Sequence, residues 1–419
     1  MGRARGIRYC TAPYRRGDFQ PFRQARSTRC SDPASDDVNQ KFLPLSRPTI
    51  GDAEIEAAAD AVRRGLLTGG GILGQQAEDT LERVIGRRAL FVTSCTSALE
   101  AAVILAGTEP GDEVICPSFT FVSTANAIVR AAARPVLVEI DPGTLNIDPD
   151  AVEAAITPQT RAVIVVHYGG RACAMERILE IARRHDLRVI EDAAHGLGAT
   201  WRAQPLGTIG DFGCFSFHGT KDIVCGEGGA LACRCHDDLR RAEVLREKGT
   251  NRAQFLRGEV DKYTWVAAGS SYVASDVLAA ILRAQLERLP NLLARKRALA
   301  ARLTERLAPI GDRVVLPREW PDIESSWHLY PILVAPHDRD PLIALLREAG
   351  IGATFHYVPL HSSPYGREVL GYSAADLPHT ERVSASLIRL PLFAAMTDEE
   401  LEDVAEATLK AVAALAHAG

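Results

Sequence analysis

Short apolar runs separated by stretches with helical spacing limit this chain to a small set of folds. The runs at residues 89–92, 113–116, 135–140 and 162–167 have the length of buried strands. Strands that alternate with helices pair in parallel, because each right-handed crossover carries the chain back to the same edge of the sheet. We therefore expect an α/β fold in which helices flank a mostly parallel sheet.

The length of the chain indicates more than one domain. Its 419 residues are typical of two or three domains, and 47% hydrophobic residues suffice for a large core. Residues 1–40 are rich in Arg, Ser, Asp and Pro without apolar periodicity, so we expect a poorly ordered extension. We expect a large domain over residues 41–289 and a smaller C-terminal α+β domain over residues 290–419, which begins where Pro290 ends a helix.

Charge and cysteine content restrict the partners and the compartment. A net charge of −5 provides no general attraction to nucleic acid or to an anionic membrane. The nine cysteines are scattered and odd in number, which favours reduced thiols in the cytoplasm over a disulfide framework. Cys233 and Cys235 lack the usual spacing of metal ligands, so we expect no metal. No apolar run has membrane-spanning length, and the N-terminus lacks the apolar segment of a signal peptide.

Lys221 and Asp192 are the first candidates for chemistry. Lys221 follows the apolar run at 214–217 in a bend of small residues, where an amine can be desolvated and made nucleophilic. Asp192 ends an apolar strand at the edge where open α/β sheets bind ligands, and its carboxylate could hold the proton of a pyridinium ring. A lysine by itself is more often a solvated surface charge, so the interpretation rests on the pair.

A phosphate site is predicted where the strand at 89–92 turns through Thr96 and Ser97 into a helix. Free N–H groups and the positive end of a helix bind phosphate, although hydroxyls that only cap the helix are the simpler alternative. Phe121, just past another strand end, could stack on a planar cofactor or belong to the core. Tyr168 follows a further strand end and would reach the same rim.

The polar segment at 249–269 is too long for a passive connection. Arg252 and Tyr263 within it suit the docking of a pyrophosphate and a base, and a solvated loop at a subunit contact is the alternative. His356 lies before a proline turn, where a single histidine is more often structural than catalytic.

Three motifs in order carry a resemblance to a known family. They are Glu-Asp-Ala-Ala-His at 191–195, Phe-Ser-Phe-His-x-x-Lys at 215–221 and Gly-Glu-Gly-Gly at 226–229. With them the chain, over roughly residues 41–416, resembles the sugar-nucleotide aminotransferases, a pyridoxal-phosphate family with the type I aspartate aminotransferase fold. The segments at 246–252, 261–265 and 355–361 are most similar to enzymes that aminate dTDP-4-keto-6-deoxy-D-glucose at C4.

The resemblance implies a role for each candidate residue. Lys221 would carry pyridoxal 5′-phosphate, Asp192 would pair with its ring nitrogen, and His195 would bond its phenolic oxygen. Contacts to the cofactor phosphate and ring would come from Thr96, Ser97, Ser216 and Phe121. Contacts to the substrate would come from Tyr168, Arg252, Tyr263 and His356. Cys95 departs from the pattern, because many members have glycine there.

The resemblance also implies transamination. L-glutamate would donate the amino group and leave as 2-oxoglutarate, and C4 of the dTDP-linked keto sugar would accept it. Lys221 favours this reaction over that of the related dehydratases, which have histidine at the same position. Amination of a 3-keto sugar nucleotide is the alternative within the family. A cofactor-binding regulator is a further one, but residues 1–40 lack the helical pattern of a DNA-binding module.

A homodimer with shared active sites is expected from two loops. The glycine-rich loop at 68–74 and the polar segment at 249–269 are long and lack a core of their own. Family members use such loops to complete the active site of the partner subunit, and a two-fold axis makes the exchange reciprocal. Val273 stands where many members have an asparagine that reaches the partner's cofactor phosphate, so another residue must make that contact.

Overall fold

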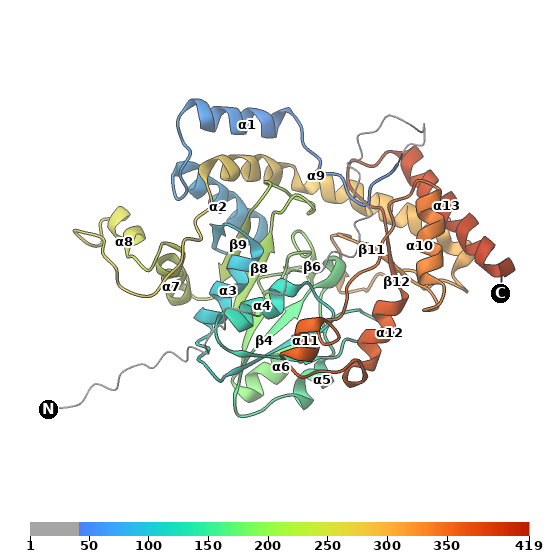
Figure 1. Ribbon diagram of the computed structural model, residues 1–419. Coiled ribbons are helices and arrows are strands. Elements are labelled where there is room, and N and C mark those ends of the chain that lie inside the picture. The colour runs from blue at the N-terminus through green and yellow to red at the C-terminus, as the bar shows by residue number, and fades with distance from the viewer. Residues whose placement is uncertain (1–41, 419) are drawn as a thin grey trace, which may run out of the picture. The chain divides into compact units, whose positions relative to one another are not determined.

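Seven strands form the central sheet of the computed structural model, which describes residues 42–418 (Figure 1). Their order is β1-β9-β8-β5-β4-β2-β3, and within this sheet only β9 runs against its neighbours. The strands are β1 (Ala89–Val92), β2 (Glu113–Pro117), β3 (Arg134–Val138), β4 (Thr160–Val166), β5 (Arg188–Asp192), β8 (Phe212–Ser216) and β9 (Gly229–Cys233). The expected α/β fold with a mostly parallel sheet is confirmed. The extension expected at residues 1–40 lies outside the described residues.

Helices cover both faces of this sheet and pack in a C-terminal layer (Figure 1). They are α1 (Asp52–Arg63), α2 (Ile72–Ile85), α3 (Cys95–Leu105), α4 (Val122–Arg130), α5 (Pro149–Ala154), α6 (Met175–His185), α7 (His236–Arg246), α8 (Arg252–Leu256), α9 (Asp276–Leu307), α10 (Arg339–Glu348), α11 (Pro364–Glu368), α12 (Pro378–Ser386) and α13 (Asp398–Ala418). Short strands lie outside the central sheet: β6 (Thr200–Trp201), β7 (Gln204–Pro205), β10 (Ile323–Glu324), β11 (Tyr330–Leu333) and β12 (Leu387–Leu390).

The strands are apolar throughout because they are buried on both faces. Successive side chains of a strand point to opposite sides of the sheet. In β1, Leu90 packs in one core with α3, whereas Phe91 packs in another with α2 and α9. The C-terminal layer has its own core, in which the antiparallel pair β11 and β12 packs with α10, α13 and the end of α9.

The expected helix end at Pro290 is wrong, because α9 continues through Pro290 to Leu307. A proline inside a helix removes one hydrogen bond and costs about 3 kcal/mol. Leu289, Leu292 and Leu293 are buried on either side of it, and each buried leucine contributes about 1.5–3 kcal/mol. The free energy gained by burying these leucines therefore outweighs the cost of the proline. The proposed division between residues 289 and 290 falls within one helix that runs from α1 and α2 to α13 (Figure 1).

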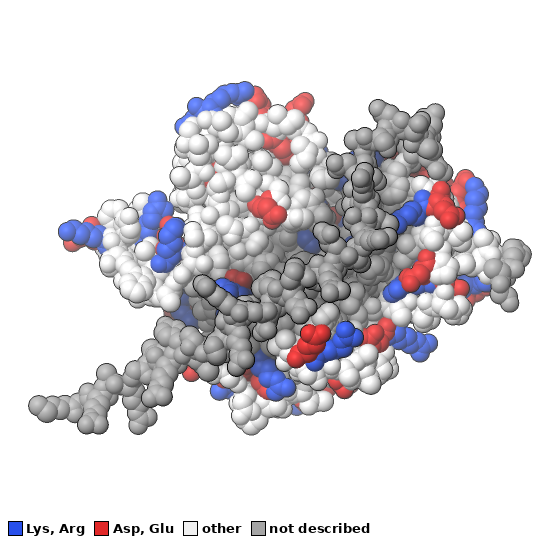
Figure 2. Space-filling view, viewed as in Figure 1, with Lys and Arg blue, Asp and Glu red and all other residues white. Residues whose placement is uncertain are grey.

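The described surface carries charges of both signs. On the face shown in Figure 2, lysines and arginines of the described residues lie beside acidic side chains rather than in one continuous basic patch. None of the described helices combines the length and apolar content needed to span a membrane.

Parallel strands bring several loops to one edge of the sheet. The carboxyl ends of β1, β2, β4, β5 and β8 meet there, because these strands run in the same direction. The loops that leave these ends carry Thr96, Phe121, Tyr168, His195 and Lys221. Ligands of open α/β sheets bind at this edge.

Candidate active site

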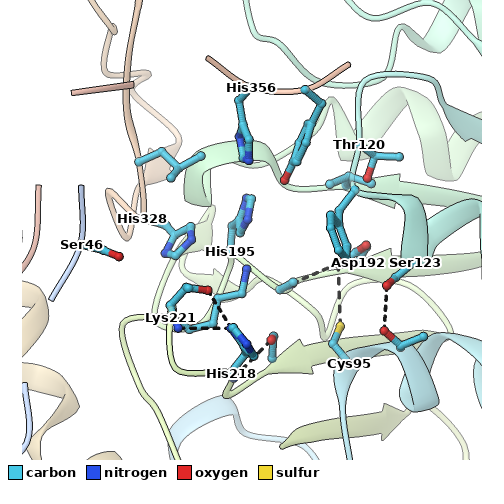
Figure 3. Close-up of a pocket in the computed structure, with 18 of the residues that line it drawn as sticks. Ser46, Cys95, Thr120, Ser123, Asp192, His195, His218, Lys221, His328 and His356 are labelled. Carbon is cyan, nitrogen blue, oxygen red and sulfur yellow. Dashed lines mark hydrogen bonds between the residues drawn. The ribbon is translucent and has the colours of Figure 1, made fainter. Parts of the chain in front are cut away.

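The carboxyl edge of the sheet borders a cavity of about 420 Å³ (Figure 3). Volumes of about 300–1,000 Å³ are typical of small-molecule sites. Most of the residues singled out in the sequence line it: Thr96, Phe121, Asp192, His195, Ser216, Lys221 and His356. The others do not line it, namely Ser97, Tyr168, Arg252 and Tyr263.

The two acidic residues at the end of β5 serve different faces of the sheet. Asp192 lines the cavity, while Glu191 points to the other side, as successive strand residues do. Glu191 accepts hydrogen bonds from the N–H groups of Ile209 and Gly210, both at 2.6 Å, and so holds the turn before β8. The motif at 191–195 therefore contains one structural carboxylate and one that faces the cavity.

The carboxylate of Asp192 is held in a fixed orientation. Its Oδ2 accepts a hydrogen bond from Thr124 Oγ1 at 2.9 Å, and its Oδ1 accepts one from the Ala194 N–H at 3.2 Å. Burial raises the pKa of Asp192, and these two hydrogen bonds oppose the rise. The sequence analysis missed Thr124. Its only signal was a hydroxyl in the first turn of a helix that packs on the sheet.

Lys221 lies in the loop between β8 and β9, which buried residues hold against the sheet. Phe217 and Cys225 are buried, and the Cys225 N–H donates to the Phe217 carbonyl at 2.9 Å. Burial lowers the pKa of Lys221, nearby acidic groups partly offset this, and the charge of Arg389 adds to it. An amine with a lowered pKa is more often unprotonated, as a nucleophilic lysine must be.

Gly229 explains the glycine-rich motif that follows Lys221. A Cβ at Gly229 would lie 2.3 Å from the carbonyl carbon of Ser94 and 2.4 Å from the nitrogen of Cys95. Only glycine therefore allows the start of α3 to rest directly on β9. Gly226 has a φ of +96°, which other residues rarely adopt, and so forms the turn before β9.

The first turn of α3 presents hydroxyl groups to the cavity. Ser94 caps the helix by accepting from the Ser97 N–H at 3.1 Å, and the Ser97 hydroxyl lies 2.7 Å from Thr93 Oγ1. Thr96 and Ser123 line the cavity with their hydroxyls 2.8 Å apart. The helix cap and the arrangement suited to an anion thus occur in the same turn, with Ser97 engaged in the cap.

Three histidines gather on the side of the cavity away from Asp192 (Figure 3). The ring of His195 stacks on that of His328, with centroids 4.3 Å apart, and lies 6.4 Å from the ring of His356. Burial lowers the pKa of all three, to about 4 for His328, to about 2 for His356 and well below the usual range for His195. The three imidazoles are therefore neutral near pH 7. His328 was missed because a lone histidine before a strand carries no pattern.

Asp222 links the histidines to α9. Its carboxylate pairs with the buried ammonium of Lys296 and lies 3.1 Å from Nδ1 of His328. Burial raises the pKa of Asp222, but Lys296 and His328 outweigh it and hold that pKa well below its usual range. The segment that carries Lys221 is thus anchored by a buried ion pair.

Arg389 is a cation that the sequence analysis missed. It lies on β12 and lines the cavity, and its Nε is buried without a hydrogen-bond partner among the residues that the structure describes. Backbone hydrogen bonds with Thr354 fix the strand, one of them 2.7 Å long. A buried N–H donor without a partner is costly, which indicates that an anionic ligand completes the site.

The predicted substrate residues lie at different depths. Tyr168 is buried behind the lining, with its hydroxyl 3.1 Å from Nδ1 of His356. Arg252 and Tyr263 belong to the segment around α8, which projects away from the sheet in Figure 1. The only carboxylate paired with Arg252 in the described chain is that of Glu247 at 3.9 Å, and Tyr263 is 54% exposed. These two residues do not reach the cavity of their own chain.

The cavity fits a planar, phosphorylated aldehyde. It offers an amine with a lowered pKa at Lys221, an oriented carboxylate at Asp192, and hydroxyls at the start of α3. Phe121 is 58% exposed and lines the cavity, so its ring is available for stacking. This set of groups matches the pyridoxal 5′-phosphate implied by the motifs.

Comparisons with known proteins agree with this geometry. The model of the DegT/DnrJ/EryC1/StrS aminotransferase family matches residues 48–409. The spore coat polysaccharide biosynthesis protein SpsC of Bacillus subtilis is 37% identical over 374 residues, which cover 87% of this chain and 96% of that protein.

Solved structures agree as well. The aminotransferase TlmJ from Streptoalloteichus hindustanus superposes with a TM-score of 0.82 at 32% identity, covering 89% of this chain and 100% of that one. The PMP-form of the putative sugar aminotransferase Spr1654 from Streptococcus pneumoniae has a TM-score of 0.82 at 28% identity, with coverage of 89% and 99%.

Proposed function

The chain belongs to the DegT/DnrJ/EryC1/StrS aminotransferase family and uses pyridoxal 5′-phosphate, and we propose that it aminates C4 of dTDP-4-keto-6-deoxy-D-glucose with L-glutamate as donor. The observation that carries the proposal is the meeting of Lys221, Asp192 and Arg389 in one cavity. The products are 2-oxoglutarate and a dTDP-4-amino-4,6-dideoxyhexose. When bound, the cofactor supplies an aldehyde that receives the amino group and a ring that accepts electrons from the adjacent carbon–hydrogen bond.

Lys221 moves the proton. Burial lowers the pKa of Lys221 and so favours the unprotonated Nζ, which can take the proton from the α-carbon of glutamate. In the second half of the reaction the same nitrogen returns a proton to C4 of the sugar. A histidine at this position could not form the covalent bond that an amine forms with an aldehyde.

Asp192 holds a proton on the ring nitrogen of the cofactor. Its Oδ1 and Oδ2 are oriented by Ala194 and Thr124, so the carboxylate keeps one direction throughout the reaction. A negative charge beside the ring nitrogen favours the protonated ring that accepts electrons. Thr96 and Ser216 hold the phosphate, and the hydroxyls of Ser94 before α3 and Ser123 in α4 also line this part of the cavity.

Arg389 binds a carboxylate of the amino donor. Its Nε lacks a partner in the described chain although it is buried, and a carboxylate accepts two parallel hydrogen bonds from a guanidinium. His195 bonds the phenolic oxygen of the cofactor, and His356 with Tyr168 lies on the side where the sugar enters. The neutral state of these imidazoles avoids repulsion of Arg389.

The active form is a homodimer whose loops complete the partner's site. Arg252 and Tyr263 lie away from the cavity of their own chain, and Trp265 nearby is 75% exposed. Such exposed aromatic residues next to arginine are typical of a contact surface that also meets a nucleotide. Mixing inactive Lys221→Ala subunits with inactive Arg252→Ala subunits should restore one working site per heterodimer. A mixture that stays inactive despite subunit exchange would place Arg252 outside the shared site.

A cytoplasmic location is part of the proposal. All cysteines in the described part of the chain are free, and Cys95, Cys116 and Cys214 are buried near the middle of the sheet. Free thiols persist in reducing compartments.

Two measurements test the function. Addition of L-glutamate to the holoenzyme should convert the visible absorption of the bound cofactor to that of its amine form, and an unchanged spectrum would favour a binding protein. Incubation with dTDP-4-keto-6-deoxy-D-glucose should then give an amino sugar, whose H3–H4 coupling in the NMR spectrum reports the configuration at C4. Turnover of a 3-keto sugar nucleotide with no turnover of the 4-keto sugar would overturn the assignment.

A further inference from the structure

A second hollow, which we call the arginine groove, lies outside the active-site cavity. It has a volume of about 640 Å³ and shares no lining residue with that cavity. Its basic residues are Arg171, Arg202, Arg297 and Arg318. Its acidic residues are Glu319, Asp322 and Glu324.

Two of the four arginines are neutralised within the groove. Arg202 pairs with Asp322 at 3.2 Å, and Arg297 pairs with Glu324. These pairs fix the walls of the groove and leave little net charge of their own. The capacity to bind a ligand therefore depends on the remaining two arginines.

Arg171 and Arg318 have no carboxylate partner in the described chain. Arg171 is only 6% exposed, and its Nη2 is buried without a hydrogen-bond partner among the described residues. Arg318 is exposed and lines the same groove, where Glu319 is the one acidic lining residue without an ion pair among the residues that the structure describes. A buried guanidinium with an unused donor is costly unless an oxyanion completes it. The buried Arg171 and the exposed Arg318 together suit a phosphate group.

An aromatic side chain lies beside this pair of arginines. Trp320 lines the groove and is 39% exposed, so part of its ring is open to a ligand. Exposed tryptophan binds planar rings by stacking, and the aromatic face tolerates any base. Guanidinium groups next to an open indole ring together match a nucleoside diphosphate, in which a charged group and a planar base are joined.

A strap at residues 325–328 connects the groove with the active site. Ser325 and Trp327 line the groove, whereas His328 lines the active-site cavity and stacks on His195. Ser326 lies between them and donates a hydrogen bond from its hydroxyl to the His195 carbonyl at 2.8 Å. Side chains of the strap thus reach both sites.

The backbone of the strap is strained at its centre. Trp327 has a φ of +52°, a conformation that bulky residues rarely adopt. The Ser326 N–H donates to the carbonyl of Gly170, the residue before Arg171, at 3.3 Å. A ligand on Arg171 would therefore act on Ser326, next to the strained Trp327, and strained segments are suited to switching.

We propose that the arginine groove is an effector site for a nucleoside diphosphate, which acts on the active site through the strap at 325–328. The phosphates bind Arg171 and Arg318, and the base stacks on Trp320. Occupancy changes the position of His328 and, through Ser326, of His195. The site is separate from the transamination chemistry, because it contains none of the residues assigned to that reaction.

Calorimetric titration of the holoenzyme with thymidine diphosphate, pyrophosphate and thymidine tests the site. We expect thymidine diphosphate to bind most tightly, pyrophosphate more weakly and thymidine not measurably. Arg171→Gln and Arg318→Gln should each weaken binding by about tenfold or more, as expected for the loss of a charge-assisted hydrogen bond. Trp320→Ala should abolish the difference between thymidine diphosphate and pyrophosphate. Arg183→Gln, which removes an exposed arginine of α6, is the matched control and should bind as wild type.

The outcomes separate this proposal from its alternatives. Equal affinity for thymidine diphosphate in wild type, Arg318→Gln and Trp320→Ala would refute the groove as the site. Both residues lie on the exposed rim, so neither change puts folding at risk. Strict competition between thymidine diphosphate and the sugar nucleotide in initial-rate kinetics would assign the binding to the active site. In wild type but not in Arg318→Gln, saturation of the groove should change KM or kcat by about fivefold or more. Unchanged kinetics with the groove saturated would refute the strap.

Discussion

Replacement of Arg389 by methionine should weaken the binding of the amino donor without destabilising the protein. The Nε of Arg389 is buried and lacks a partner in the described chain, so the folded protein carries an uncompensated cost there. Methionine keeps the length of the side chain and removes the charge and the donors. Arg389→Met therefore distinguishes two roles of the arginine. A ligand-binding arginine can be replaced without loss of stability, whereas a structural arginine is paired within the fold and its replacement destabilises the protein.

The expected magnitudes follow from this geometry. A hydrogen bond to a charged group contributes about 1.5–3 kcal/mol, which corresponds to about a 10- to 150-fold rise in the KM for glutamate. The KM for the sugar nucleotide should change less than that for glutamate, because the keto sugar ring offers Arg389 no carboxylate. Methionine removes an unpartnered donor from a partly buried site, so the melting temperature should stay the same or rise.

Single-turnover absorbance measurements with L-glutamate give the donor affinity, and calorimetric melting of the apoprotein gives the stability. Arg389→Lys is the matched control, because it keeps the charge but loses the two parallel donors, and we expect an intermediate donor affinity. A lower melting temperature of Arg389→Met together with an unchanged KM for glutamate would show that Arg389 is structural.

Three further predictions concern the active site. Lys221→Ala should abolish turnover and the visible absorption of the lysine-bound cofactor while circular dichroism stays native, and retention of more than about 1% of wild-type activity would contradict its role. Asp192→Asn should still bind cofactor but lose about 10²–10⁴-fold in rate, because an amide cannot hold the ring proton, and a rate near that of wild type would make Asp192 structural. The folded-state pKa values of His328 and His356, about 4 and about 2, lie below the unfolded value of about 6.5. Stability should therefore be fully present above pH 6.5 and fall as the pH drops toward 4, by about 1.4 kcal/mol per pH unit for each histidine. Urea unfolding at pH 7.5, 6 and 5 measures this, and a constant free energy of unfolding would contradict it.

Local pattern was enough to predict the sheet and the first residues of the site. Apolar runs that alternate with helical spacing pair in parallel, and parallel strands bring their carboxyl ends together. Asp192, Lys221 and Thr96 each lie at or after the carboxyl end of a strand, so a parallel sheet places them at the same edge. The glycines within 226–229 were visible as a motif in the sequence. Why glycine is needed at Gly229 became clear only from the structure, in which β9 packs directly against the start of α3.

Tertiary structure alone decided the other half of the site. Thr124, His328 and Arg389 reach the cavity from a helix, a strap and a strand that are distant in sequence, and no spacing relates them to Lys221. Tertiary structure also decided the course of the chain at Pro290. A local rule predicted a helix end there, but burial of the neighbouring leucines keeps the helix intact. The alternation of strands and helices follows from short-range patterns of polarity. Which buried charge lacks a partner depends on what every packed element brings near it, and only the folded chain determines that.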